Sequence, residues 1–282
     1  MAVPPLPSIM IEPSVRAALL EDLGRAGDIT TDAVVPVEAR AETALVARRA
    51  GVVAGLDCAL MAFRLIEPAI KTDVKRPDGN AVGTGDVIAT IAGPTRGILS
   101  AERVALNFLC HLSGIASAAA VIVRSIKGHH ARLVCTRKTV PGLRALQKYA
   151  VRVGGGFNHR FGLDDGVLIK DNHVAAAGGL AAAVTRARAA IGHLVKIELE
   201  VDTLAQLEEA LRLPVDAVLL DNMSLDELRR AVALADGRLI TEASGRITAE
   251  TAPAVAATGV DLLSSGWLTH SVPALDIGLD WR

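Results

Sequence analysis

Apolar residues in the first third of the chain follow two different spacings, which predict a mixture of helices and strands. Residues 15–23 and 56–66 place apolar side chains three and four positions apart, the pattern of an amphipathic helix. Residues 42–55 read as a pair of strands that breaks at Gly51, and residues 86–93 read as a further strand that begins at a turn. This part of the chain therefore predicts an α/β domain.

A long apolar stretch follows, and it predicts a long helical segment over residues 98–126. Ser100 has the side chain preferred at a helix N-cap, and Glu102 suits the first turn of the helix. Gly114 lies near the middle of the stretch, where it predicts a break.

From about residue 131 the pattern changes to short apolar runs that alternate with helical patterns such as residues 203–213 and 224–235. Alternation of this kind predicts parallel strands joined by crossover helices. The runs are apolar throughout, as expected for a sheet that is covered on both faces. The predicted strands are residues 132–138, 166–172, 195–201, 216–222, 238–245 and 260–266.

Each of these strands ends in charged, Ser or Gly residues, and the ends of parallel strands meet on one face of a sheet. An even spread of polar groups over all strand ends favours a β/α barrel over a doubly wound sheet, which uses mainly one crevice. Six or seven strands are visible, fewer than eight, so the barrel is expected to be incomplete. The strand ends are Arg137 with Lys138, Lys170 with Asp171, Glu200, Asp221, Glu242 with Ser244, and Ser264 to Gly266.

Composition excludes several classes of function. Among 282 residues, 51% are apolar, only 2% are aromatic, and the formal net charge is −1, so a nucleic-acid-binding surface is not expected. The first residues do not resemble a secretory signal, and no uncharged apolar run is long enough for a membrane span. Cys58, Cys110 and Cys135 are widely spaced and odd in number, which indicates a reducing compartment and buried thiols. A cytoplasmic protein is expected.

Positive charge is concentrated between Thr136 and Asn172, although the whole chain is nearly neutral. From Arg137 to Lys170 there are seven Arg or Lys residues and His159, against two acids, Asp164 and Asp165. Arg and Lys at strand ends and loops suit a small, highly charged anion. Three further cations of this segment lie in a helical pattern and are expected to be solvated surface residues: Arg144, Lys148 and Arg152.

The sequence resembles the quinolinate phosphoribosyltransferase family. The resemblance is carried in order by EDLGRAGDITTD, SAERVALNFLCHLSGIAS, TRKTVPGLR, GGGFNHR, IKDNH and LTHSVPALDIGLD, and it extends over nearly the whole chain. It implies an N-terminal α/β, sandwich-like domain over residues 1–112, to which residues 274–282 return, and an open β/α barrel over residues 113–273. It also implies transfer of phosphoribosyl from phosphoribosyl pyrophosphate to quinolinate with loss of CO₂, a step of NAD biosynthesis.

The resemblance implies a role for individual cations. Lys138 is expected to face the pyrophosphate of the donor, and Arg103 to reach the acceptor in a neighbouring subunit. The chain is therefore expected to form a homodimer or a higher homo-oligomer with shared active sites. The residues expected to hold quinolinate within the subunit are Arg137, His159, Arg160 and Lys170.

Carboxylates at neighbouring strand ends are expected to serve the sugar. Glu200 and Asp221 can hold ribose hydroxyls, directly or through Mg²⁺, and can stabilise positive charge on the ring. Together with Lys138 they are the predicted catalytic residues. Glu198 lies on the same strand face as Glu200, and only the resemblance prefers Glu200.

Short Gly and Ser turns after the last two strands are expected to hold a phosphate through backbone N–H groups. The residues are Ser244, Gly245, Ser265 and Gly266. Trp267 departs from the small residue that is more usual in the family. The remaining histidines are expected to be structural, with His173 and His270 near the site: His111, His129, His130, His173, His193 and His270.

The residues leave two alternatives open. One is a related phosphoribosyltransferase that takes a monocarboxylate such as nicotinate, or a relative tied to molybdate genes. The number of cations given to the acceptor argues against a monocarboxylate. The other is a catalytically silent barrel that senses phosphosugars, which the presence of both Glu200 and Asp221 disfavours.

Overall fold

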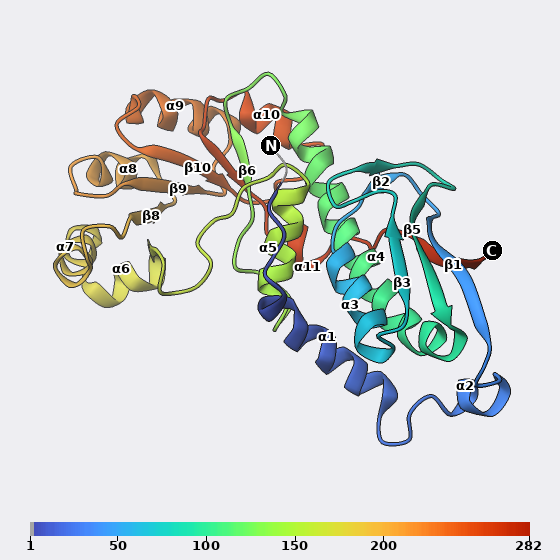
Figure 1. The fold of residues 1–282 in the computed structure, drawn as a ribbon. Coiled ribbons are helices and arrows are strands. Elements are labelled where there is room, and N and C mark those ends of the chain that lie inside the picture. The colour runs from blue at the N-terminus through green and yellow to red at the C-terminus, as the bar shows by residue number, and fades with distance from the viewer. Residues whose placement is uncertain (1–2) are drawn as a thin grey trace. The chain divides into compact units, whose positions relative to one another are not determined.

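The computed structural model describes residues 3–282, and the chain divides into two compact units (Figure 1). Unit 1 comprises Met1–Ala120, Val140–Gly155 and Ser271–Arg282. Unit 2 comprises Val121–Thr139 and Gly156–His270. Unit 1 thus includes a middle segment of the chain as well as the two ends.

Unit 1 contains a four-stranded antiparallel sheet in the order β12-β1-β5-β3. The C-terminal strand β12 (Ile277–Trp281), red in Figure 1, pairs antiparallel with the blue strand β1 (Arg40–Ala47), with Leu279 opposite Leu45. On its other edge β1 pairs with β5 (Val87–Pro94), which in turn pairs with β3 (Lys71–Val74). The end of the chain is therefore a structural strand of unit 1.

The two strands predicted within residues 42–55 both form, but they do not pair with each other. β2 (Gly51–Val52) pairs with β4 (Ala81–Val82) and not with β1. The predicted helices are present as α1 (Ser8–Leu23) and α3 (Leu56–Ile66), and the short helix α2 (Ile29–Val34) and the helix α5 (Arg144–Val153) complete the unit. The cysteines form no disulfide among the described residues, and Cys58 and Cys135 are buried.

The long helix α4 (Thr95–Ser125) runs through Gly114 without interruption, so the predicted break there is wrong. Gly114 is a close-contact position: a Cβ would lie 2.3 Å from the carbonyl oxygen of Pro273. By length and composition α4 could cross a membrane, but 61% of its most apolar window is buried inside the structure, as in the core helix of a folded domain. The boundary expected after residue 112 lies within this helix.

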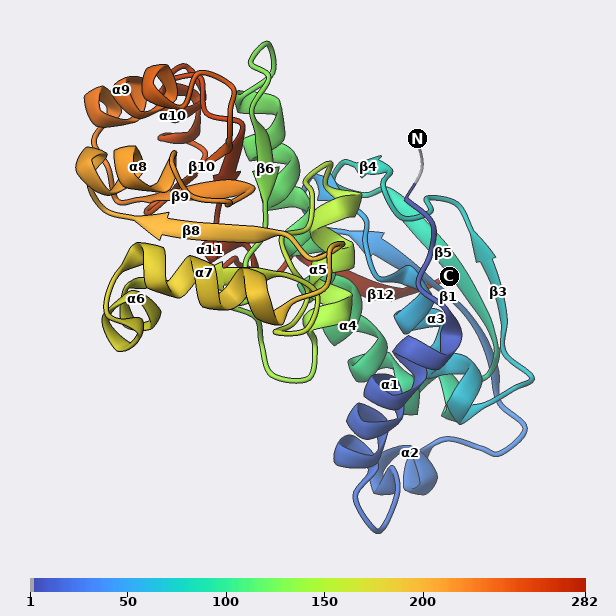
Figure 2. The same ribbon diagram turned by 90° about the vertical axis from the view of Figure 1, so that its left-hand side faces the viewer.

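Unit 2 contains a six-stranded parallel sheet in the order β6-β11-β10-β9-β8-β7. Figure 2 shows β8, β9 and β10 side by side, with α7, α8 and α9 flanking them. The edge strands β6 and β7 do not pair with each other within residues 3–282, so the predicted open barrel is confirmed. The strands are β6 (Arg132–Val134), β7 (Val167–Ile169), β8 (Ile197–Val201), β9 (Ala217–Asp221), β10 (Ile240–Ser244) and β11 (Leu262–Ser264).

Helices begin a few residues after the strands, because polar residues at the strand ends cap them. Thr203 and Ser224 each accept a hydrogen bond from a backbone N–H of the first turn and form capping boxes. The carboxyl ends of the strands therefore carry both the helix caps and the polar groups left over for a ligand. The helices are α6 (Asp171–Ala177), α7 (Leu180–Ala190), α8 (Leu204–Ala210), α9 (Leu225–Ala235), α10 (Ala252–Ala256) and α11 (Trp267–His270).

Candidate active site

A pocket of about 870 Å³ opens at the carboxyl ends of the strands of unit 2. Every predicted site residue except Arg103 lines it. Arg137, Lys138, His159, Arg160 and Lys170 bring the cations and the imidazole, and Glu200 and Asp221 bring the carboxylates, while the Gly and Ser turns close another part of the wall. Residues predicted from six separate strand ends thus share one cavity.

A segment beside β6 carries His159 and Arg160. Phe157 forms a parallel bridge with Val134, and its N–H donates to the Leu133 carbonyl at 2.8 Å. This added bridge aligns the following residues, His159 and Arg160, with the end of β6. His159 and Arg160 therefore line the same pocket as Arg137, although more than 20 residues separate them along the chain.

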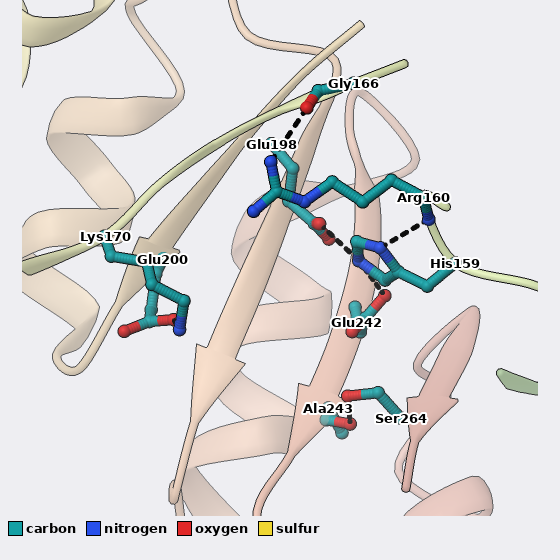
Figure 3. Close-up of polar contacts among 9 residues, drawn as sticks. All are labelled: His159, Arg160, Gly166, Lys170, Glu198, Glu200, Glu242, Ala243 and Ser264. Atoms are coloured by element: carbon teal, nitrogen blue, oxygen red, sulfur yellow. Dashed lines mark hydrogen bonds and ion pairs between the residues drawn. The ribbon is translucent and has the colours of Figure 1, made fainter. Parts of the chain in front are cut away.

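The two arginines lie close enough for their charges to interact. Burial, and then the charge of Arg137, lowers the pKa of Arg160 from its usual value. Nη1 of Arg160 donates to the carbonyl of Gly166 at 2.9 Å, which orients the guanidinium (Figure 3). Nε of Arg137 is buried and has no hydrogen-bond partner among the described residues. A buried N–H donor of this kind is costly unless an anion satisfies it.

Lys170 is paired with a carboxylate in the pocket. Its Nζ lies 2.5 Å from Oε2 of Glu200, and Figure 3 shows the two side chains together at the ends of β7 and β8. The backbone N–H of Lys170 donates to Nδ1 of His173 at 2.9 Å, so His173 caps α6, as expected of a structural histidine. A ligand anion at Lys170 must share the ammonium group with Glu200.

Asp221 and Gly245 lie at adjacent strand ends. Asp221 is in register with Ser244, and its Oδ2 accepts a hydrogen bond from Nδ2 of Asn222 at 2.7 Å. Gly245 has a φ of +108°, and a Cβ there would lie 2.3 Å from Oδ1 of Asn222. Only glycine fits this turn, which keeps the backbone open toward the pocket.

Gly245→Ala is expected to disturb this corner of the pocket, because the added methyl group must displace Asn222 and strain a left-handed backbone. Backbone strain of this type costs about 1–3 kcal/mol, which a urea titration would measure. Gly192→Ala is the matched control, since nothing lies within 4 Å of its Cβ position in the described structure. Equal stability of the two variants would contradict the geometry given for Gly245.

The turn after β11 differs in part from expectation. The backbone N–H of Ser265 donates to the carbonyl of Val134 at 3.1 Å, and its buried Oγ donates to the carbonyl of Ile247 at 2.9 Å, so both donors serve the fold. Thr269 donates to the carbonyl of Lys138 at 2.8 Å and ties α11 to the β6 end. Trp267 and His270 both line the pocket, although neither was among the predicted binding residues.

Two buried glutamates beneath His159 were missed by the sequence reasoning. Glu198 and Glu242 project from β8 and β10, and Nε2 of His159 lies 2.8 Å and 3.5 Å from their respective Oε2 atoms (Figure 3). The available signal was an acid in the middle of an otherwise apolar strand. Glu198 was noted only as a neighbour of Glu200, and Glu242 only as a strand-end residue.

Two predicted cations lie elsewhere. Arg103 is exposed on α4, in unit 1, and does not line the pocket of its own chain. Lys148 on α5 is 1% exposed, so the expectation that it is a solvated surface residue is wrong. Arg152, one turn further along α5 and near the end of the helix, is exposed as expected.

Comparison with known families identifies the family and the fold. The sequence matches the family models of the quinolinate phosphoribosyl transferase N-terminal domain over residues 28–113 and of the C-terminal domain over residues 115–280. The chain belongs to the quinolinate phosphoribosyltransferase family. The predicted family, fold class and enzyme class are therefore confirmed, and the match extends over both units.

Relatives of similar length support this membership. The chain is 46% identical over 275 residues to the nicotinate-nucleotide pyrophosphorylase [carboxylating] of Mycobacterium leprae, covering 95% of each chain. It is 44% identical over 261 residues to the probable nicotinate-nucleotide pyrophosphorylase [carboxylating] of Bacillus subtilis, covering 93% of this chain and 90% of the relative. The crystal structure of NadC from Streptococcus pyogenes is 41% identical, with a TM-score of 0.94 over 99% of both chains.

Proposed function

We propose that the chain transfers the phosphoribosyl group of phosphoribosyl pyrophosphate to quinolinate and releases CO₂, forming nicotinate mononucleotide and pyrophosphate for NAD biosynthesis. One observation supports the assignment most directly: a cationic cavity with an unpartnered, buried Arg137 Nε also holds two carboxylates at neighbouring strand ends. Such a cavity suits an anionic acceptor beside a sugar that becomes positively charged.

The acceptor occupies the end of the pocket formed by Arg137, Arg160 and Lys170. Quinolinate carries two adjacent carboxylates, and planar guanidinium groups form paired hydrogen bonds with carboxylates. Burial, and then the charge of Arg137, lowers the pKa of Arg160, and a dianion between the two guanidinium groups relieves their mutual repulsion. A monocarboxylate would leave part of this charge uncompensated.

The donor occupies the other end. Lys138 faces the pyrophosphate, and the turns at Ser244, Gly245 and Gly266 offer backbone N–H groups to the 5′-phosphate. Ser265 shapes the turn, since its hydroxyl donates to the carbonyl of Ile247 and its backbone N–H donates to the carbonyl of Val134 at 3.1 Å. A Cβ at Gly266 would lie 2.8 Å from Cδ of Lys138, so the glycine leaves room for the lysine stem.

Catalysis in this proposal depends on the orientation of the two substrates and on stabilisation of the charge that develops between them. As pyrophosphate departs, C1′ of the ribose becomes positive, and the carboxylates of Glu200 and Asp221 stabilise this charge. The pyridine nitrogen then bonds to C1′ and becomes positive, so it stabilises the electron pair left on the adjacent ring carbon when the carboxylate departs as CO₂. That carbon then takes a proton from water, which gives nicotinate mononucleotide. No covalent bond to the protein is required, and most of the rate enhancement comes from orientation.

Mg²⁺ fits the carboxylates of this site. Magnesium takes one or two protein carboxylates together with phosphate oxygens and water, and Glu200 and Asp221 supply two hard oxygen donors at the pocket wall. When bound, the ion neutralises charge on the leaving pyrophosphate. Glu200 must loosen its contact with Lys170 to take part, because one of its oxygens is already paired.

The active unit in this proposal is a cytoplasmic homodimer or a higher homo-oligomer. Arg103 is exposed on α4 and absent from the pocket of its own chain, which leaves it available to a neighbouring chain. An isologous pairing would give each pocket one arginine from its partner. This assigns Arg103 to the acceptor end of the neighbouring site.

Arg160→Ala is expected to weaken quinolinate binding by about 1.5–3 kcal/mol, or roughly ten- to a hundredfold, through loss of a charge-assisted pair. Isothermal calorimetry with each substrate would show far less change for phosphoribosyl pyrophosphate. Arg160→Lys is the control, because it keeps the charge and loses the planar guanidinium group. Its affinity for quinolinate should fall between those of wild type and Arg160→Ala. An equal loss of affinity for both substrates would contradict the division of the pocket.

Release of labelled CO₂ from carboxyl-labelled quinolinate tests the reaction itself. Purified protein with phosphoribosyl pyrophosphate and Mg²⁺ should release CO₂ and pyrophosphate in equal amounts. A nicotinate-specific transferase would release pyrophosphate with nicotinate and no CO₂ with quinolinate. A silent phosphosugar sensor would release neither product.

A further inference from the structure

Three ionisable side chains from three separate elements meet beneath the acceptor end of the pocket. His159 comes from the segment beside β6, Glu198 from β8 and Glu242 from β10 (Figure 3). Their ligand atoms all lie within 4.8 Å of one another. Glu198 is 9% exposed and Glu242 is 1% exposed, so two acids are buried next to each other.

The hydrogen bonds of His159 fix the position of its proton. The backbone N–H of Arg160 donates to Nδ1 at 2.7 Å, so Nδ1 is an acceptor and carries no proton. Nε2 therefore carries the proton and donates it to Oε2 of Glu198 at 2.8 Å. The imidazole is neutral, and both of its nitrogens are used inside the protein.

Two adjacent buried carboxyl groups with one donor between them do not both ionise. The oxygens of Glu242 have no hydrogen-bond partner of normal geometry within residues 3–282. Burial, and then the charge of Glu198, raises the pKa of Glu242 to about 7, while His159 and Ser264 act in the opposite direction. Glu242 is therefore the member of the pair that stays protonated below about pH 7.

No other charged group reaches Glu242 from the adjoining strands. At its register β9 presents Leu219 and β11 presents Leu262, both apolar. The hydroxyl of Ser264 lies 3.5 Å from the carbonyl of Ala243. The charge of Glu242 thus depends on Glu198 and His159 alone among the ionisable groups of the described structure that act on it.

We propose that Glu198 and Glu242 are positioning residues for the acceptor site. Glu198 anchors a neutral His159, which holds the backbone of Arg160. Glu242 stays protonated, so that no second negative charge lies beneath the cationic pocket. The inference rests on the proposed acceptor site and deepens it. It adds a second role for His159, which also positions Arg160.

A metal ion is a poorer occupant of the same cluster, despite the three potential ligands. A histidine that binds a metal through Nε2 carries its proton on Nδ1 and donates it to an acceptor. Here Nδ1 faces the N–H of Arg160, a donor, so metal binding would place two hydrogens against each other.

The consequence is a pH dependence of acceptor binding. Below pH 7 Glu242 is neutral. Above pH 7 its carboxyl group ionises, and the new negative charge lies close to the bound quinolinate dianion and repels it. KM for quinolinate is then expected to rise about tenfold between pH 6 and pH 8, because only the protonated form binds well. KM for phosphoribosyl pyrophosphate should change little over the same range, since Glu242 lies at the acceptor end.

The experiment compares KM for both substrates in wild type, Glu242→Gln and Glu198→Gln from pH 6 to pH 9. Glu242→Gln keeps the shape and stays neutral, so its KM for quinolinate should stay flat at the low-pH value. Glu198→Gln removes the anionic acceptor of His159 and should raise KM for quinolinate at every pH, with little change in KM for the donor. Glu208→Gln, an exposed acid on α8, is the matched control and should follow wild type.

An alkaline rise in Glu242→Gln equal to that of wild type would overturn the proposal. One zinc ion per chain that is lost in Glu242→Gln would overturn it too, in favour of a metal site. If Glu242→Gln does not fold, ¹⁵N spectra of histidine-labelled wild type decide: His159 should be neutral and protonated at Nε2, and an Nδ1-protonated ring would refute the anchor. Absence of CO₂ release by wild type would refute the proposed function, while these spectra would still test the cluster.

Discussion

Asp221→Asn is expected to lower kcat by about a hundredfold to a thousandfold while the fold is kept, because the carboxylate acts on charge that develops only in the transition state. The side chain keeps its shape, and Asn222 can still hydrogen-bond to the amide oxygen that replaces Oδ2. KM for either substrate should change much less than kcat. Steady-state kinetics with saturating Mg²⁺ and both substrates would measure the loss.

Asp226→Asn is the matched control for this experiment. Asp226 is on α9, its side chain is 89% exposed, and it pairs only with Arg229 in the next turn of the helix. Its loss should leave kcat unchanged and affect stability by a few tenths of a kcal/mol. Near-normal turnover in Asp221→Asn would reject a catalytic role for this carboxylate.

Mixing two inactive variants should restore activity if each pocket takes Arg103 from a neighbouring chain. Arg103→Ala damages the partner's site and Lys138→Ala damages the chain's own site. A mixed dimer then has one doubly defective pocket and one intact pocket. After complete random exchange, half of the dimers are mixed, so roughly a quarter of wild-type activity should appear.

A second mixture provides the control. Lys138→Ala and Lys170→Ala both damage the chain's own pocket, so every pocket in their mixed dimers keeps one defect and activity should stay absent. Native mass spectrometry would confirm that mixed dimers form in both cases. Mixed Arg103→Ala and Lys138→Ala dimers without activity would mean that Arg103 serves its own subunit or none.

Strand ends were predictable from the sequence because they depend on local pattern. Arg137, Lys170, Glu200 and Asp221 each follow an apolar run, and a parallel sheet brings all such ends to one face. Their convergence on a single pocket required only the alternation of strands and helices. The exact pairing of β2 with β4, by contrast, depends on contacts between segments that are far apart in sequence.

The errors arose where tertiary contacts override local rules. Gly114 reads as a helix break, yet it is there because Pro273 approaches the helix too closely for a side chain. Lys148 reads as a surface cation, yet it lies in the run of buried residues 146–151 in the middle of α5. The partnership of Glu198 with Glu242 was invisible because the intervening strand β9 separates them in the sheet, and only the curvature of the barrel brings them to His159.

The bridge between Phe157 and Val134 makes the two ends of the pocket unequal in their tolerance of change. Asp221 and Ser244 sit in strands paired on both sides, so a shift there would disturb several ladders. The segment that carries Arg160 joins the sheet at one isolated bridge, backed by Arg132 stacked 5.0 Å from the Phe157 ring. Substitutions can therefore accumulate in this segment while the strands that carry Asp221 and Ser244 stay unaltered.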